Sequence, residues 1–146
     1  MEVNAYPVQL RGVVPTPGGT AVFLTTDAKT FVIYIEPGAG NVLRATLDRE
    51  RFSRPLTHEL MGRILGGFDI KLEHVVIFHV EENIFHARMV LRMRNELGTK
   101  ILEVDSRPSD ALTLAAQTRR PLYVTADVLE KVDDMSEILE RILKAK

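Results

Sequence analysis

The segment from Ile84 to Met93 alternates between apolar and polar side chains, and this alternation constrains the fold more tightly than composition does. The apolar positions are Phe85, Ala87, Met89, Leu91 and Met93. The other face carries His86, Arg88, Val90, Arg92 and Arg94. Because successive side chains of a strand point to opposite faces, the pattern predicts a strand with one core face and one basic face. An apolar run over 74–80, separated from it by Glu81-Glu82-Asn83, predicts the hairpin partner.

Shorter runs rich in β-branched and aromatic residues predict the remaining strands. We expect them at residues 8–13, 21–25, 30–35, 100–104 and 121–124, the second and third forming a hairpin. Apolar residues at helical spacing predict helices over 39–51 and 57–66, with Thr57 able to cap the second. A helix following Asp110 is apolar on most sides, which is typical of a buried helix.

No linker or low-complexity run divides the 146 residues, so a single globular unit is expected. We assign the domain to residues 1–130. Residues 131–146 predict a C-terminal amphipathic helix, either part of the same domain or an interaction segment that docks on a partner or a second copy.

Composition excludes several functions. The chain has no cysteine, which rules out disulfides, thiolate metal sites and a cysteine nucleophile, and is compatible with a cytoplasmic location. No segment resembles a secretory leader or approaches the roughly 18 apolar residues of a membrane span, so we expect no membrane partner. The formal net charge of −1 requires that any binding to DNA or RNA come from a local basic patch.

Two segments share an unusual pattern. Ser53-Arg54-Pro55 and Ser106-Arg107-Pro108 each precede a hydroxyl residue and an acid at the start of a predicted helix. Proline and an acid are both expected in a first helical turn. Helix formation does not account for the arginine before each proline, or for Asp105 at the end of the preceding strand.

These segments carry a resemblance to a known family. The run Arg54-Pro55-Leu56-Thr57-His58-Glu59-Leu60 and the run Asp105-Ser106-Arg107-Pro108-Ser109-Asp110-Ala111 resemble the two signature segments of the bifunctional nuclease domain. Three strands match as well, at 31–35, 84–87 and 121–124, so the resemblance covers about Val22 to Leu129. It implies an α+β fold, in which a mixed, largely antiparallel sheet packs with three to five helices.

The chain departs from the family pattern at two positions. Ala39 stands where the family usually has an acid at the start of the first helix, and Glu36 is the nearest substitute. His86 stands where the family tends to have tyrosine.

The predicted catalytic residues are His58, Glu59, Asp105 and Asp110. The three acids are candidates for a divalent metal site, because Mg²⁺ and Mn²⁺ prefer oxygen ligands and can activate water. Their alternative roles are helix capping and ion pairing. A histidine titrates near neutrality, so His58 is a candidate general base or metal ligand, with a structural role as the alternative.

The predicted phosphate-binding residues are Arg54, Thr57, Arg107 and Ser109. A guanidinium suits phosphate, although each arginine can instead lock a carboxylate, for instance Arg107 with Asp105. Thr57 and Ser109 suit helix caps equally well. The predicted nucleic-acid surface is the cationic strip formed by His79, His86, Arg88, Arg92 and Arg94, which nearby glutamates can balance.

The resemblance implies a sequence-nonspecific, metal-assisted nuclease that acts on DNA and RNA, and we expect a homo-oligomer. The alternative is a noncatalytic regulatory or assembly module, in which the two Arg-Pro segments hold the fold together and a groove or the last helix binds a partner.

Overall fold

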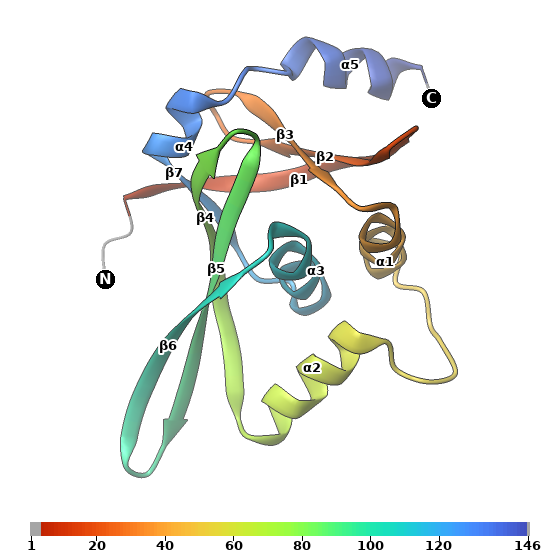
Figure 1. Ribbon diagram of the computed structural model, residues 1–146. Helices are drawn as coiled ribbons and strands as arrows, with labels where there is room; N and C mark the ends of the chain where they lie inside the picture. Colours follow the sequence, from red (N-terminus) through yellow and green to blue (C-terminus); the bar gives the residue numbers. More distant parts are fainter. Residues whose placement is uncertain (1–3, 146) are drawn as a thin grey trace.

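The computed structural model describes residues 4–145, and in this part of the chain it contains one seven-stranded sheet and five helices (Figure 1). Residues 1–3 and 146, at the ends of the predicted domain and last helix, lie outside it. The strands are β1 (Ala5–Thr16), β2 (Gly19–Thr25), β3 (Thr30–Ile35), β4 (Ile70–Glu81), β5 (Ile84–Asn95), β6 (Gly98–Ser106) and β7 (Leu122–Thr125). The helices are α1 (Pro37–Leu47), α2 (Thr57–Gly67), α3 (Pro108–Thr118), α4 (Ala126–Lys131) and α5 (Ser136–Lys144).

The sheet order is β3-β2-β1-β7-β4-β5-β6. Two antiparallel meanders, β1 to β3 and β4 to β6, form its two halves, and the four-residue strand β7 joins them. β7 pairs antiparallel with β1 and parallel with β4. All other strand pairs of the described sheet are antiparallel. The prediction of a mixed, largely antiparallel sheet with up to five helices is therefore confirmed.

The helices α1, α2 and α3 lie on one side of the sheet, and α3 occupies the space between its two halves (Figure 1). The burial of α3 follows from its sequence, because Ala111, Leu112, Leu114 and Ala115 are all at most 2% exposed. They share a core with inward side chains of both meanders, such as Val22 and Ile77. On the opposite side, Leu139 of α5 packs against Ala21 and Phe23 of β2.

The strand β5 follows the predicted alternation. Ala87, Met89 and Leu91 are buried in the core, whereas His86 and Arg94 are exposed on the other face. In the described residues, no helix is both long and apolar enough to cross a membrane.

One helix prediction needs correction, and one helix was missed. The helix expected over 39–51 runs from Pro37 to Leu47, because Arg49 adopts a left-handed backbone conformation at φ 55° that no α-helix continues. Its guanidinium donates to the Ala116 and Gln117 carbonyls at the end of α3, which holds the turn in place. The short helix α4 was not predicted. It begins at a Thr125 cap, whose hydroxyl accepts from the Val128 N–H.

Candidate functional site

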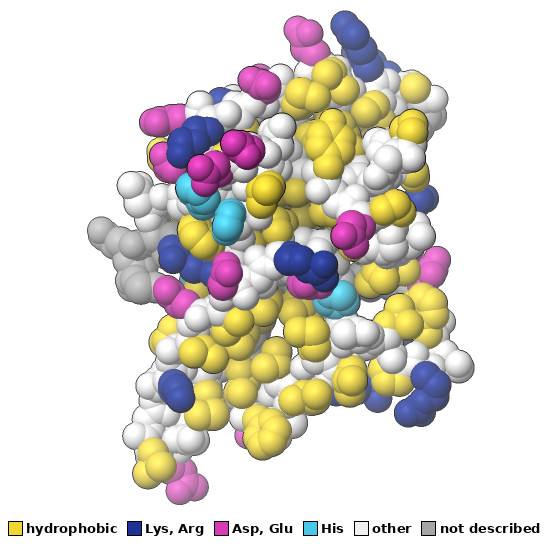
Figure 2. Space-filling model, viewed as in Figure 1, with side chains coloured by type: hydrophobic (Ala, Val, Ile, Leu, Met, Phe, Trp, Pro, Cys, Tyr) yellow, Lys and Arg dark blue, Asp and Glu magenta, His cyan; other side chains and the backbone are white. Residues whose placement is uncertain are grey.

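The starts of α2 and α3 meet at a three-residue network. Asp110, in the first turn of α3, accepts a hydrogen bond from Arg107 Nε at 3.1 Å. Its other carboxylate oxygen lies 2.9 Å from Nε2 of His58, in the first turn of α2. Two helix starts that are distant along the chain are thereby joined through one carboxylate. Figure 2 shows acidic, basic and histidine side chains gathered near the middle of this face.

The three groups differ in their access to solvent. The side chain of His58 is 16% exposed, that of Asp110 31% and that of Arg107 70%. Burial alone would raise the pKa of Asp110, but the hydrogen bonds from His58 and Arg107 outweigh it and hold that pKa below its ordinary value. The same carboxylate raises the pKa of Arg107. At neutral pH the network therefore contains an ionised Asp110 between a cationic arginine and an imidazole.

An ionised Asp110 selects the histidine tautomer. A carboxylate only accepts hydrogen bonds, so Nε2 of His58 carries a proton, and in the neutral imidazole the lone pair is then on Nδ1. No described group donates to Nδ1 or accepts from it. His58 is held from its backbone as well, because the Gln117 side-chain amide donates to the His58 carbonyl at 2.9 Å.

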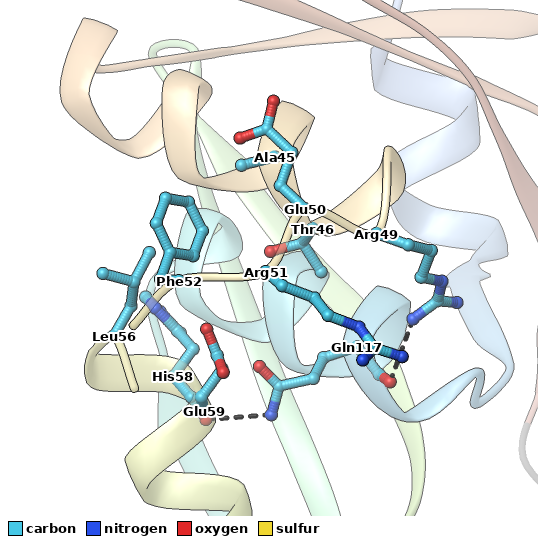
Figure 3. A pocket seen from close by; sticks show the side chains of 10 residues that line it. All are labelled: Ala45, Thr46, Arg49, Glu50, Arg51, Phe52, Leu56, His58, Glu59 and Gln117. Atoms are coloured by element: carbon cyan, nitrogen blue, oxygen red, sulfur yellow. Dashed lines mark hydrogen bonds between the residues drawn. The ribbon is translucent and has the colours of Figure 1, made fainter. Parts of the chain in front are cut away.

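A hollow of about 280 Å³ opens beside His58 (Figure 3). It lies between the end of α1, the loop that follows it and the start of α2. Figure 3 shows His58 and Glu59 on one side, below Phe52, with the side chain of Arg51 extending across toward Gln117. Ion pairs of the described residues involve neither Glu59 nor Arg51, so both charges are available to a bound group.

Arg107 and Ser109 line a second hollow of about 280 Å³, on the other side of the start of α3. Glu36, the residue nearest to the acid that the family pattern places at position 39, lines it too. The network thus lies between two hollows.

The structure does not assemble the predicted metal ligands. Within residues 4–145, no group of three or more histidine or acidic side chains is close enough to hold an ion. Asp105 is exposed and lies opposite Arg88 on the outer face of the sheet, whereas α3 with Asp110 packs on the inner face. Glu59, Asp105 and Asp110 therefore do not form the expected cluster, and Arg107 pairs with Asp110 rather than Asp105.

The predicted caps also need correction. The residue that precedes α2 is Leu56 and the one that precedes α3 is Arg107, and neither side chain caps its helix. Thr57 is the first residue of α2, and Ser109 lies inside the first turn of α3, where it is 9% exposed. Arg54 is exposed in the loop before α2. The two Arg-Pro segments therefore differ, since Pro108 begins its helix and Pro55 lies outside.

The cationic strip is partly neutralised. Arg92 pairs with Glu73, and Arg88 pairs with Glu103 at 3.9 Å and lies over the Phe78 ring. His79 lies 3.6 Å from Glu81, and its ring stands 5.1 Å from that of His86. The predicted balance by neighbouring glutamates is thus present for two of the strip's three arginines, through Glu73 and Glu103.

Sequence reasoning missed three residues of the site: Arg49, Arg51 and Gln117. Each lies outside the signature segments. Arg49 and Arg51 reach the site because the loop after α1 folds toward the end of α3, and Gln117 because α3 packs beside α2. Gln117 has a weak sequence signal, as a polar residue near the end of an otherwise apolar helix.

Comparisons with known proteins agree with the fold and the signature segments. Two relatives are the uncharacterized protein MT1877 of Mycobacterium tuberculosis strain CDC 1551 and the uncharacterized protein Rv1829 of strain H37Rv. Each is 33% identical over 76 residues, which are 52% of this chain and 42% of the relative, so the match spans less than half of the relatives' length. A family model described as the bifunctional nuclease domain matches residues 22–136, most of the chain. The chain therefore belongs to the bifunctional nuclease domain family.

Proposed function

We propose that this protein is a sequence-nonspecific nuclease that hydrolyses phosphodiester bonds of DNA and RNA at the Arg107–Asp110–His58 network. The observation that carries the proposal is the bridging of His58 and Arg107 by Asp110, with distances of 2.9 and 3.1 Å. Membership of the bifunctional nuclease domain family supports the same reaction class.

His58 is the general base of this proposal. Its Nδ1 lone pair accepts a proton from water as the water oxygen attacks phosphorus. The resulting imidazolium is stabilised by Asp110, whose carboxylate is already hydrogen-bonded to Nε2. The proton returns to the leaving oxygen or to solvent after the P–O bond breaks.

Phosphate binding is assigned to Arg107 and the start of α3. Only Nε of Arg107 is engaged by Asp110, so the two terminal nitrogens remain for a phosphate oxygen. The N–H groups of Ser109 and Asp110 have no acceptor within the helix and favour an anion beside them. Glu59 and Arg51 line the hollow beside His58, where they would contact the nucleic-acid strand on the other side of the scissile bond.

Mg²⁺ or Mn²⁺ assistance stays a prediction. The described residues do not form a ready-made cation site, so no step of the mechanism is routed through an ion.

The test is cleavage of labelled single-stranded DNA and RNA by purified wild type, His58→Ala and Asp110→Asn. We expect each variant to lose about 100-fold or more in rate, because general-base catalysis contributes that much. Asp27→Asn is the matched control and should cleave like wild type, since Asp27 is exposed in the turn between β2 and β3 and lines neither hollow of the site.

Each protein is assayed with EDTA, Mg²⁺ and Mn²⁺, after its fold is verified by circular dichroism. Absence of cleavage by wild type under all three conditions contradicts the proposal. So does an Asp110→Asn variant that is folded and fully active, since this would mean that a contaminating nuclease or another site performs the cleavage.

One observation favours the alternative, a noncatalytic module. Asp110 is already bonded to both Arg107 and His58, as expected of a group that only pins the starts of α2 and α3 together. In that case Asp110→Asn would lower the melting temperature, and wild type would bind nucleic acid or protein without cleaving it.

A further inference from the structure

The hollow at the start of α3 has an aromatic side. It lies between the edge strand β3, the β4–β5 turn and α3, and Tyr34 of β3 lines it together with Arg107. Tyr34 is 66% exposed, whereas Phe31 of the same strand is fully buried. Tyr34 and Arg107 therefore border the same small space.

A second hollow of about 240 Å³ continues along the same edge. It shares Tyr34, Asn83 and Phe85 with the first, and Lys131 of α4 lines its far side. A cation thus lies on each side of the tyrosine, Arg107 in one hollow and Lys131 in the other. The pairing of Lys131 with Asp127 is an exposed one within α4, and such pairs contribute little to stability.

The acids in this groove limit where an anion can lie. Glu36 lines the first hollow and Asp133 the second. An anion is favoured only near the two cations, so the groove suits a ligand with separate negative groups and an uncharged planar part between them.

We propose that this groove binds one unpaired nucleotide of a single strand, with its base stacked on Tyr34 and its flanking phosphates at Arg107 and Lys131. The inference rests on the proposed nuclease function and deepens it, since it names single-stranded DNA or RNA as the substrate class. A duplex does not present a free base face, whereas any unpaired base can stack on an aromatic ring.

The turn between β4 and β5 supports this assignment. Glu82 and Asn83 both have positive φ, 51° and 64°, which is the conformation of a tight hairpin turn. Asn83 is thereby held at the junction of the two hollows, where its amide can donate to or accept from a base edge.

The chain offers a direct probe, because it contains no tryptophan. In Tyr34→Trp, the new indole is the single tryptophan of the protein, and a stacked base quenches its fluorescence. The titration uses a single-stranded DNA of about 8 nucleotides. It is performed in a His58→Ala background so that the proposed cleavage does not consume the probe.

An abasic oligomer of equal length separates stacking from phosphate binding. We expect the ordinary oligomer to quench the indole fluorescence. The abasic oligomer should not quench it and should bind at least about tenfold more weakly. Measured by the fluorescence anisotropy of a labelled oligomer, Tyr34→Ala should weaken binding about tenfold and Tyr34→Phe should not, because the ring carries the effect. Tyr6→Ala, at an exposed tyrosine of β1, is the matched control.

Equal binding of both oligomers, or unchanged binding by Tyr34→Ala, overturns the inference. These outcomes are separable from failure of the nuclease proposal. If wild type binds through Tyr34 but never cleaves, the subsite is supported and the nuclease proposal is contradicted. If cleavage is the same in Tyr34→Ala as in wild type, the nuclease proposal is supported and the subsite is contradicted.

Discussion

At the scale of single residues, His74 shows how burial changes protonation. Nε2 of His74 on β4 is buried without a hydrogen-bond partner, and the Tyr123 ring stands edge-on at 5.4 Å. Burial lowers the pKa of His74, as does Arg88, while Glu73 and Glu103 act in the opposite direction.

This shift makes stability depend on pH. The unfolded chain binds a proton at His74 near its ordinary value of 6.5, whereas the folded chain resists it until lower pH. The stabilisation is thus fully present above pH 6.5 and is lost as the pH falls below it. We expect the melting temperature to fall between pH 7.5 and 5.5, and to fall less in His74→Phe. An exposed-site variant, His86→Gln, should keep the wild-type slope, and an unchanged slope in His74→Phe would contradict the prediction.

The residue types of the site were predictable, but their partners were not. The signature segments identified His58, Arg107 and Asp110, since these stand at the starts of two predicted helices. The pairing of Asp110 with His58 depends on how α2 crosses α3, which local sequence does not determine. Arg107 bonds Asp110 from three residues earlier at the same helix start. Asp105 illustrates the same limit, because the strand pairing places it on the opposite face of the sheet.

At the scale of elements, the contact between α1 and β2 depends on one glycine. A Cβ added to Gly40 would overlap the side chain of Thr20, which is 4% exposed and has no room to move. Gly40 therefore sets how closely α1 approaches the sheet.

Gly40→Ala should destabilise the protein by about 1–3 kcal/mol, the usual cost of overpacking. Gly38→Ala on the same helix is the matched control, because an added Cβ there meets no neighbour and alanine favours the helix. Urea unfolding measures both, and equal stability of the two variants would show that α1 shifts freely over β2.

Most elements were predictable from periodicity, whereas their ends and connections were not. The alternation in 84–93 and the apolar character of α3 follow directly from burial. The end of α1 depends on the left-handed Arg49, whose conformation is supported by its distant contact with the end of α3. The six-residue helix α4 is too short for a periodic signal, although Thr125 marks its start.

At the scale of the whole molecule, a broad apolar surface remains open (Figure 2). Leu60 and Ile64 of α2 are 50% and 52% exposed, Phe68, which follows the helix, is 70% exposed, and α2 has no fully buried residue. Ile101 and Leu102 of the edge strand β6 are half-exposed as well. Surfaces of this kind are frequently covered by another protein copy.

The predicted homo-oligomer is tested by sedimentation equilibrium. We expect wild type to self-associate, and Ile64→Glu with Phe68→Glu to shift it toward monomer, because a charge on each contact would have to be desolvated. Leu143→Glu, at an exposed apolar position of α5, is the matched control. A wild type that stays monomeric at all concentrations contradicts the prediction.

The strand β7 has a consequence for biosynthesis. Each meander consists of neighbours in the chain and can form as its residues leave the ribosome, since local pairs close quickly. In the described sheet the two meanders are joined through residues 122–125, so the sheet stays in two pieces until these residues are synthesised. A nascent chain stalled before Leu122 exposes the edges of β1 and β4 together, and a ribosome-bound intermediate of that length is the species on which chaperones should act.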